Sequence, residues 1–501
     1  MTEKLVFRLF LSLFIITFSF LPHSVNADAP PKHEVRAVWL TTIGGIDWPH
    51  NYANTPSAAE RQKQELRSIL DKLQHANINT VLLQTRIRAT AIFPTSQASG
   101  NEPWDGCLSG KPGKSPGYDA LQFAIDECHA RGMYIHAWVV TIPVGKWNSY
   151  GCRTLRERHG SLVMRIGDEG FMNPADARTA TYLADYCRDL ARRYDLDGIH
   201  LDYIRYPEEA KKFPDSKLYN QSGKRRNVAD WRRENINRIV YRLYDYVKQV
   251  KPWVQVSSSP LGKYSRIEQV PNAGWTAYES VYQDPKRWME EGKQDMIVPM
   301  MYYLHKNFFP FVDNWVSLSN GRLIVPGLGA YRMDKSEADW TVNDITDQID
   351  YSRYFGGAGC AFFRCGNVLY NEKGLYQELR DHYYPYPAQL PPLTWLNDRV
   401  PTAPKEIRVN REGDELHLTW DKPAEEQETL TYTVYYALND SIDSNSARHV
   451  LATLIHGETL YLPVDTLREQ GYTFSVSAST RYHVESAPSP STYYYLSKYV
   501  K

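Results

Sequence analysis

The stretch DLDGIHLDYIRYP, residues 195–207, decides the fold of the larger part of the chain. It contains a short apolar run that ends in an acid, Asp202. Side chains alternate between the two faces of a strand, so Ile199 and Leu201 share one face. His200 and Asp202 share the other face. The apolar pair suits a layer of covering helices, so the pattern predicts a buried strand that carries an acid at its tip.

Strand-like and helical stretches alternate throughout residues 33–390. Eight short apolar runs are each followed by an amphipathic helical stretch. Eight strand–helix units predict an α/β fold, a (β/α)8 TIM barrel. A doubly wound open sheet is the competing topology, but no Gly-rich phosphate loop follows any of the runs. The expected strands are 34–40, 79–86, 133–140, 197–202, 253–260, 295–303, 322–328 and 358–363.

The chain changes character near residue 390. Residues 391–404 are rich in proline and turn residues and predict a linker between domains. Residues 405–501 hold short alternating runs without a helical pattern, which predicts a small all-β sandwich domain. Trp420 and Tyr472 lie where fibronectin type III-like domains keep a core tryptophan and a corner tyrosine, so this segment resembles that class.

Residues 1–27 have the parts of a secretory signal peptide. Lys4 and Arg8 precede an apolar run over 9–21, and small residues near Ala27 are spaced like a cleavage site. The run is short for a membrane span, and an uncleaved anchor is the alternative. We therefore expect an exported protein, periplasmic or secreted, that is soluble and has no stable membrane insertion after cleavage.

The composition narrows the classes of partner. Lys+Arg and Asp+Glu both total 58, so no basic excess indicates a nucleic-acid partner. Aromatic residues reach 13%, which fits either sugar-binding surfaces or a tyrosine-rich core. The six cysteines are scattered, so disulfides and buried free thiols both stay open. No His–Cys cluster has zinc spacing, and we expect neither a metal nor a cofactor.

Several aromatic and polar residues gather at the expected mouth of the barrel, where active sites of this fold lie. One or two acids among Trp, Tyr and Arg fit a sugar site better than a metal site, because hard metals need several clustered carboxylates. A satisfied polar layer inside the barrel is the alternative for Arg36, Gln84 and His136. The candidates at the mouth are Trp39, Arg86, His136, Trp138, His200, Asp202, Arg205, Tyr302 and Tyr303.

The chain resembles the family 10-like glycosyl hydrolases, which are exported barrel proteins of bacteria. The resemblance covers residues 34 to about 385 and includes the motifs EVRAVWLTTIGGIDWP, NTVLLQTR, YDLDGIHLDYIRYP and DMIVPMMYY. Tyr203 departs from the pattern, since many members carry a second acid there. Some members act on glycan strands of peptidoglycan. The resemblance implies glycoside hydrolysis with Asp202 as the central catalytic residue, and sugar contacts at Trp39, Arg86, Trp138 and Tyr302.

Glycoside hydrolysis ordinarily uses two carboxyl groups. Asp202 is the expected nucleophile or base. The later strands end without an acid, so we expect the second carboxyl on a loop. Asp284, just before the helix expected at 285–292, is the first choice, and an N-cap role is its alternative. Asp47 and Glu268 are weaker candidates.

The expected function is hydrolysis of O-glycosidic bonds in a polysaccharide, with peptidoglycan glycan strands as the first candidate substrate. A non-catalytic glycan-binding barrel is the alternative, favoured by the missing second acid at a strand end. An esterase built on the SSSP run at 257–260 is a weaker idea, because the run lacks the G-x-S-x-G context.

Overall fold

The computed structural model describes residues 30–222, 226–438 and 440–497. The signal peptide expected at 1–27 therefore lies outside the described residues. Within the described ranges, no helix combines the length and the apolar character that a bilayer crossing requires.

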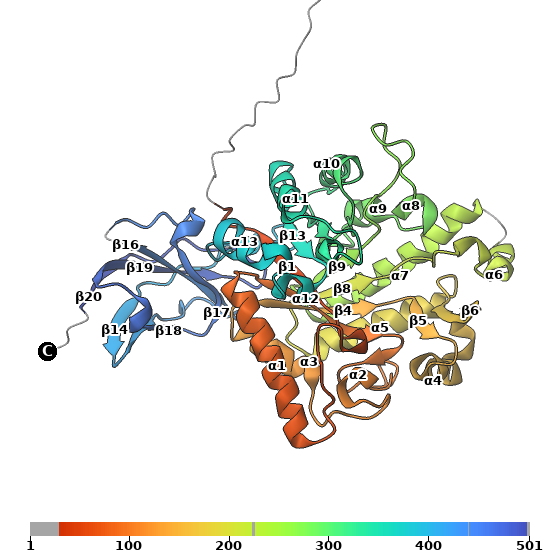
Figure 1. Ribbon diagram of the computed structural model, residues 1–501, viewed down its shortest axis with the longest axis horizontal. Helices are drawn as coiled ribbons and strands as arrows, with labels where there is room; N and C mark the ends of the chain where they lie inside the picture. The colour runs from red at the N-terminus through yellow and green to blue at the C-terminus, as the bar shows by residue number, and fades with distance from the viewer. Residues whose placement is uncertain (1–29, 223–225, 439, 498–501) are drawn as a thin grey trace, which may run out of the picture.

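A parallel sheet forms the centre of the larger part of the chain (Figure 1). Its strand order is β11-β10-β9-β8-β4-β2-β1-β13-β12, and the short β3 (Thr90–Ala91) pairs with β2. The strands are β1 (Val35–Leu40), β2 (Thr80–Ile87), β4 (Tyr134–Val140), β8 (Gly198–Asp202), β9 (Gln255–Ser259), β10 (Met296–Ile297), β11 (Leu323–Ile324), β12 (Gly327–Leu328) and β13 (Gly359–Phe362).

The two ends of this strand order lie on one extended segment, because β11 and β12 are separated by only two residues. The Val325 N–H donates to the Ile297 carbonyl at 2.9 Å, which joins the segment to β10. The Phe363 N–H donates to the Leu328 carbonyl at 2.9 Å, which joins the same segment to β13. The parallel sheet therefore curls back on itself, as the repeated strand–helix pattern predicts.

Helices cover the outside of the sheet (Figure 1). Asp119, Asp176 and Thr341 accept hydrogen bonds from first-turn N–H groups of three of them, which explains where those helices begin. The helices are α1 (Pro56–His75), α2 (Gly106–Ser109), α3 (Ala120–His129), α4 (Tyr150–His159), α5 (Ala177–Arg193), α6 (Ser216–Gln221), α7 (Val228–Val250), α8 (Ala277–Ser280), α9 (Pro285–Glu290), α10 (Phe309–Ser317), α11 (Val342–Tyr354), α12 (Cys365–Leu369) and α13 (Leu375–Glu378).

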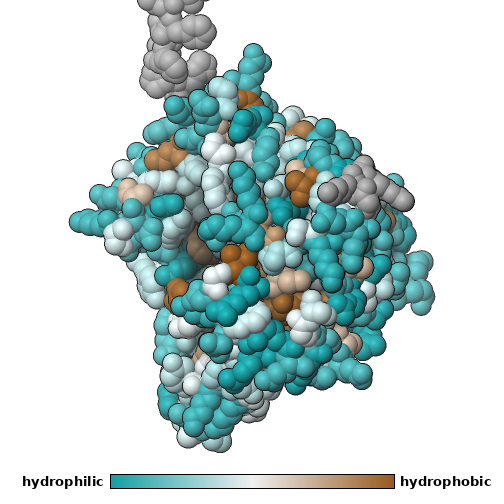
Figure 2. Space-filling model, turned by 90° about the vertical axis from the view of Figure 1, so that its right-hand side faces the viewer, coloured by the Kyte–Doolittle hydropathy of each residue, from teal (hydrophilic) through white to brown (hydrophobic). Residues whose placement is uncertain are grey.

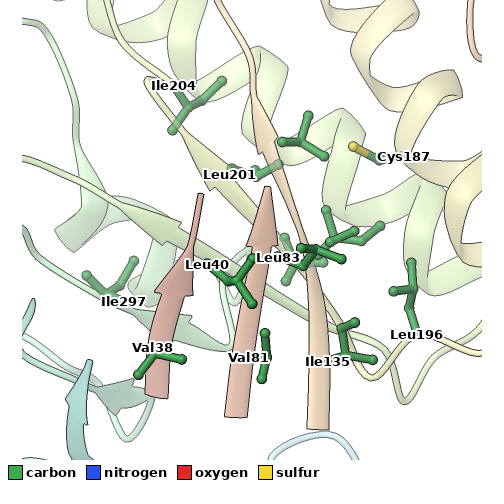
Figure 3. Packing of buried hydrophobic residues seen from close by; sticks show 14 of the residues in the cluster. Val38, Leu40, Val81, Leu83, Ile135, Cys187, Leu196, Leu201, Ile204 and Ile297 are labelled. Atoms are coloured by element: carbon green, nitrogen blue, oxygen red, sulfur yellow. The ribbon is translucent and has the colours of Figure 1, made fainter. Parts of the chain in front are cut away.

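The side chains of the strands alternate between two cores. One face of each strand packs against the helices in a single apolar cluster, which includes Leu40, Leu83 and Leu201 (Figure 3). The other face points into the barrel, where Trp39 belongs to a second cluster and His200 is fully buried. Burying a Leu or Val side chain contributes about 1.5–3 kcal/mol, so the alternation fixes which face Asp202 occupies.

An insertion follows β4 and was not anticipated from the sequence. It contains β5 (Pro143–Lys146), α4, β6 (Val163–Ile166) and β7 (Glu169–Met172), and its strands pair antiparallel in the order β5-β7-β6. The Met172 N–H donates to the Ile142 carbonyl at 2.8 Å, which ties β7 to the segment just past β4. The insertion therefore stands at the carboxyl ends of the parallel strands (Figure 1).

The C-terminal region is all-β, as its alternating runs predict. One sheet has the order β14-β15-β18 and the other has the order β17-β16-β19-β20. Trp420 and Tyr472 are both buried in its core. The strands are β14 (Arg408–Glu412), β15 (Glu415–Thr419), β16 (Thr431–Leu438), β17 (Val450–His456), β18 (Thr459–Pro463), β19 (Gln470–Ser479) and β20 (Thr492–Leu496).

This all-β region lies against the amino-terminal end of the parallel sheet, on the side opposite the insertion (Figure 1). Arg481 pairs with Asp195, just ahead of β8, at 2.8 Å. Lys32 pairs with Glu485 at 2.6 Å. The all-β region therefore contributes no wall to the carboxyl-terminal mouth.

All six cysteines are buried, and none of them forms a disulfide.

Candidate active site

A cavity of about 720 Å³ opens at the carboxyl ends of the parallel strands. Figure 2 faces this end and shows hydrophobic residues around a hollow near the middle of a largely hydrophilic surface. Residues in or after β2, β4, β8, β10 and β13 and residues of the insertion line the cavity, among them Arg88, Trp138, Ile166, Glu169, Phe171, Asp202, Tyr203, Arg205, Glu208, Glu209, Tyr302 and Phe363.

Asp202, at the end of β8, lies in this cavity with only 5% of its surface exposed. Its Oδ2 accepts a hydrogen bond from the Trp138 indole N–H at 3.0 Å. Its Oδ1 accepts from the Ser259 hydroxyl at 2.9 Å and from the Tyr203 N–H at 2.8 Å. Three donors from three segments therefore converge on one carboxyl group.

The charge state of Asp202 is set by two opposing effects. Burial raises the pKa of its carboxyl above the ordinary value, because water cannot solvate the anion. The hydrogen bonds from Ser259, Tyr203 and Trp138 and the nearby Arg205 guanidinium oppose the shift, because each stabilises the anion. Asp202 is thus a buried carboxyl group whose donors offset only part of the effect of lost water, a combination typical of a functional acid.

The turn after Asp202 holds a tyrosine in the left-handed region, since Tyr203 has a φ of 51°. Non-glycine residues seldom adopt this conformation, and strain of this kind gathers at functional sites. The Arg205 guanidinium lies 4.7 Å from the centre of the Tyr203 ring and 3.7 Å from the Glu208 carboxylate. The turn therefore presents an aromatic ring and a cation at the same side of the cavity as Asp202.

An aromatic wall stands at the ends of β10 and β13. The Tyr302 and Phe363 rings are stacked with centroids 5.5 Å apart, and both line the cavity. The Tyr331 ring meets each of them edge to face at 5.6 Å. Together with Trp138, this wall offers apolar ring faces of the kind that pack against the C–H faces of sugars.

Three of the expected substrate contacts, Trp39, His136 and His200, are buried inside the barrel and do not line the cavity. The Trp39 indole N–H donates to His200 Nε2 at 3.1 Å, and His200 Nδ1 lies 2.9 Å from the Ser257 hydroxyl. Burial lowers the pKa of His200 well below its usual range and that of His136 to about 4. His136 does not fit the alternative of a satisfied polar layer either, because neither of its ring nitrogens has a hydrogen-bond partner among the described residues.

Arg86, which was expected to contact sugar, does not line the cavity either. Its side chain is fully buried and pairs with Glu102, with Nη2 and Oε1 2.6 Å apart and Nε and Oε2 2.9 Å apart. Its Nη1 donates to the Thr141 carbonyl at 3.0 Å. The pairing of β2 with β4 shifts register between Gln84 and Arg86, which redirects the side chain away from the cavity. Arg86 therefore holds the end of β4 in place and does not reach the site.

Asp284 and Tyr303 do not line the cavity either. Asp284 caps α9, where its side chain accepts from the Arg287 N–H, and its Oδ1 accepts from the Tyr264 hydroxyl at 2.9 Å. The Lys263 ammonium lies 4.7 Å from the centre of the Tyr303 ring. The structure therefore does not bring Asp284 together with Asp202, and the N-cap alternative describes its position.

Of the ten predicted site residues, four lie together in the cavity: Trp138, Asp202, Arg205 and Tyr302. The sequence reading missed three acids that share the lining, Glu169, Glu208 and Glu209. No residue pattern signalled Glu169, because the insertion that carries it is not part of the strand–helix repeat. Within the described ranges, no group of three or more His, Cys, Asp and Glu side chains is arranged to hold a metal ion.

The chain is similar to several known proteins. The family model described as glycosyl hydrolase-like 10 matches residues 34–314. Glycosyl hydrolase YngK of Bacillus subtilis is 28% identical over 98% of this chain and 99% of its own. Glycosyl hydrolase DigH of Escherichia coli is 30% identical over 63% of this chain and 79% of its own. A solved alpha-L-fucosidase from Paenibacillus thiaminolyticus aligns with a TM-score of 0.47 at 13% identity, over 70% of this chain and 49% of that one.

Proposed function

Because the chain belongs to the glycosyl hydrolase-like 10 family, we propose that it hydrolyses O-glycosidic bonds of a polysaccharide. The observation that carries this proposal is the setting of Asp202, a nearly buried carboxyl that accepts three hydrogen bonds at the floor of an aromatic-walled cavity. A group held in this way is costly to bury without a task. Its position at a strand end is the place where enzymes of this fold carry out chemistry.

Asp202 serves as the nucleophile or the base. Its three donors favour the carboxylate, which is the form that attacks a sugar carbon or takes a proton from water. The transition state of glycoside hydrolysis carries positive charge at the sugar ring, and a fixed anion nearby stabilises that charge. The mechanism also requires a second carboxyl group.

The walls of the cavity supply the substrate contacts. Trp138 and Tyr302 present ring faces for sugar rings, and Arg205 presents a cation beside Asp202. The volume of about 720 Å³ falls within the usual range for ligand sites. Peptidoglycan glycan strands are the first candidate substrate, supported by the expected export and by the family resemblance.

The domain boundaries at 33–390, 391–404 and 405–501 belong to this proposal, as does a fibronectin type III-like C-terminal module. A hydrogen bond supports the assignment of the C-terminal module. The Tyr472 hydroxyl donates to the Arg468 carbonyl at 3.0 Å, as a corner tyrosine does in such sandwiches. The module tethers the barrel to a glycan or another surface from the face opposite the cavity.

A non-catalytic glycan-binding protein is the second candidate. One observation favours it, since none of the described parallel strands that follow β8 ends in an acid that could pair with Asp202. The cavity and its aromatic wall would then bind sugar without cleaving it.

Assays of reducing-end release with Asp202→Asn decide between the two. The substrates are purified peptidoglycan glycan strands, chitin, cellulose and mannan. We expect the wild type to release fragments from at least one of them and Asp202→Asn to lose at least about 10²-fold in rate while still binding that glycan. Asp284→Asn is the matched control, because it changes a partly buried acid outside the cavity. Binding without any cleavage by the wild type would establish the second candidate.

A further inference from the structure

We propose that Glu169 is the second carboxyl group of the hydrolytic site and acts as its general acid, facing Asp202 across the cavity. This inference rests on the proposed hydrolase function and names the residue which that function lacks. Asp202, Glu169, Glu208 and Glu209 are the acids that line the cavity in the part of the chain that the structure describes.

Two of these acids are already engaged with cations at the rim. Glu208 is 67% exposed and lies 3.7 Å from Arg205. Glu209 is 54% exposed and pairs with Lys212 at 2.7 Å. Glu208 and Glu209 are therefore surface carboxylates in contact with solvent. Ion pairs of this kind contribute little to stability.

Glu169 differs from them in its surroundings. It is only partly exposed, and among the described residues its carboxyl forms no hydrogen bond and no ion pair. Phe171 and Ile166, from the same insertion, line the cavity beside it. A half-buried carboxyl without a partner, aimed at a cavity that already holds a bonded carboxylate, is placed to serve a substrate.

The backbone explains why Glu169 faces the cavity. Glu169 and Phe171 are two residues apart on β7, so their side chains leave the same face of the strand. Gly170 between them faces the other way, where a Cβ would lie 2.6 Å from the Cys152 sulfur. The insertion therefore turns one face of β7 toward Cys152 and the other, with Glu169, toward the cavity.

The insertion is also joined to the strand that carries Asp202. The Thr141 N–H and hydroxyl both donate to the Asp202 carbonyl, at 3.0 and 2.8 Å. The next residue, Ile142, accepts from the Met172 N–H of β7 at 2.8 Å. Two consecutive residues thus connect the end of β8 to β7, which fixes one carboxyl relative to the other.

The surroundings assign opposite roles to the two groups. Asp202 receives three hydrogen bonds that stabilise its anion, so it acts as the nucleophile or base. No donor within the described ranges is bonded to the Glu169 carboxyl, so this group is left to contact the glycosidic oxygen of a bound sugar. This division of roles follows the rule that the two carboxyl groups of a glycosidase have different environments.

The reaction balances with these two groups and one water. Glu169 gives its proton to the glycosidic oxygen as the bond between that oxygen and the anomeric carbon breaks. Asp202 either bonds to the anomeric carbon, or takes a proton from the water that does so. In the first case, the bond between Asp202 and the anomeric carbon is a glycosyl ester. Water then cleaves this ester, and one proton of that water passes to Glu169. In the second case Asp202 releases its proton and Glu169 regains one from solvent. The products are two shorter glycans in both cases.

The test compares Glu169→Gln with the wild type on two substrates. One is the glycan that the wild type cleaves, and the other is a dinitrophenyl glycoside of the same sugar, whose leaving group departs without protonation. We expect Glu169→Gln to lose about 10²- to 10⁴-fold on the glycan, and to stay within about tenfold of the wild type on the dinitrophenyl glycoside. The alkaline limb of the wild-type pH profile of kcat/KM should also disappear in the variant.

Asp168→Asn is the matched control, because Asp168 is the neighbouring acid, lies outside the cavity lining and is 71% exposed. It should behave as the wild type does on both substrates. Equal cleavage of the glycan by Glu169→Gln and the wild type would overturn the assignment and leave the hydrolase intact. Parallel losses on both substrates, with the pH profile unchanged, would reduce Glu169 to a structural role. A wild type that cleaves no glycan overturns the proposed function, and this assignment with it.

Discussion

The Ser259 hydroxyl, at the end of β9, lies 2.9 Å from Asp202 Oδ1, at the end of β8. Neighbouring strands of a parallel sheet place their carboxyl ends side by side, and Asp202 and Ser259 are direct partners in the register of β8 and β9. The site therefore uses the fifth strand of the barrel to stabilise the acid on the fourth strand.

Replacing Ser259 by Ala should move the acidic limb of the pH–rate profile to higher pH. Burial already raises the pKa of Asp202, and the Ser259 hydrogen bond opposes that shift. Without it, the carboxylate forms only at higher pH, so activity below neutral pH should fall about tenfold. The profile of kcat/KM against pH is the measurement. The control is Ser257→Ala, a substitution on the same strand as Ser259 that removes the contact between Ser257 and His200. It should leave the acidic limb of the profile in place.

Replacing Tyr302 by Ala should weaken substrate binding, because Tyr302 belongs to the aromatic wall. Loss of a stacked ring is worth about 1–2 kcal/mol, so KM should rise about tenfold. Tyr303→Ala changes the next residue, which does not line the cavity, and should keep KM near that of the wild type. Equal effects of the two substitutions would show that the cavity is not the sugar site.

Replacing Arg86 by Ala should destabilise the fold. It leaves Glu102 buried without its cation, and breaking a buried pair costs about 3–5 kcal/mol. Chemical denaturation monitored by tryptophan fluorescence gives the change in unfolding free energy. The double variant Arg86→Met, Glu102→Leu should recover most of the loss, because no unpaired charge stays buried. If Arg86→Ala keeps full stability but loses sugar affinity, the original expectation of a sugar contact would return.

The stability of the protein should fall as the pH drops through the range from about 6.5 to about 4. Burial lowers the pKa of His136 to about 4, so the folded state binds fewer protons than the unfolded state in this window. Protonation then favours unfolding, and His136 contributes about 3 kcal/mol to this loss. His483, whose pKa is also lowered to about 4, adds to it.

The substitution His136→Leu isolates the contribution of His136 to the pH dependence of stability. The variant should show a shallower decrease of unfolding free energy between pH 6.5 and 4, measured by denaturant titration at several pH values. His129→Asn is the opposite control, because its partner Asp197 raises the pKa of His129. The protonated form of His129 is favoured by folding, so its stabilising effect is present at low pH and lost as the pH rises through its raised pKa.

The sequence predicted the position of Asp202 because local geometry decides it. Ile199 and Leu201 reach the helix-facing core, while His200 and Asp202 face inward, as strict alternation requires. The same periodicity, repeated along residues 33–390, predicted the parallel sheet. Trp138, which lies inside β4, was found for the same reason, and Tyr302 lies five residues after the end of β10.

Arg86 and Asp284 do not line the cavity, and the reasons differ. A register shift turns Arg86 away from the mouth, and Glu102 then pairs with it. Asp284 is held by the start of α9 and by the Tyr264 hydroxyl. The Arg86–Glu102 pair is not encoded by a strand end or by a spacing, whereas the N-cap position of Asp284 is local and was the alternative that the sequence offered.

The sequence by itself determined the strand–helix repeat, the all-β C-terminal region and the face of β8 that carries Asp202. Only the tertiary structure decided that Arg86 supports β4, that Trp39 and His200 do not line the cavity, and that an insertion brings Glu169 into the lining of the cavity that holds Asp202. The physical reason is that side-chain alternation follows from the covalent backbone of a single strand. The partners of a side chain depend on how segments far apart in the sequence meet in space.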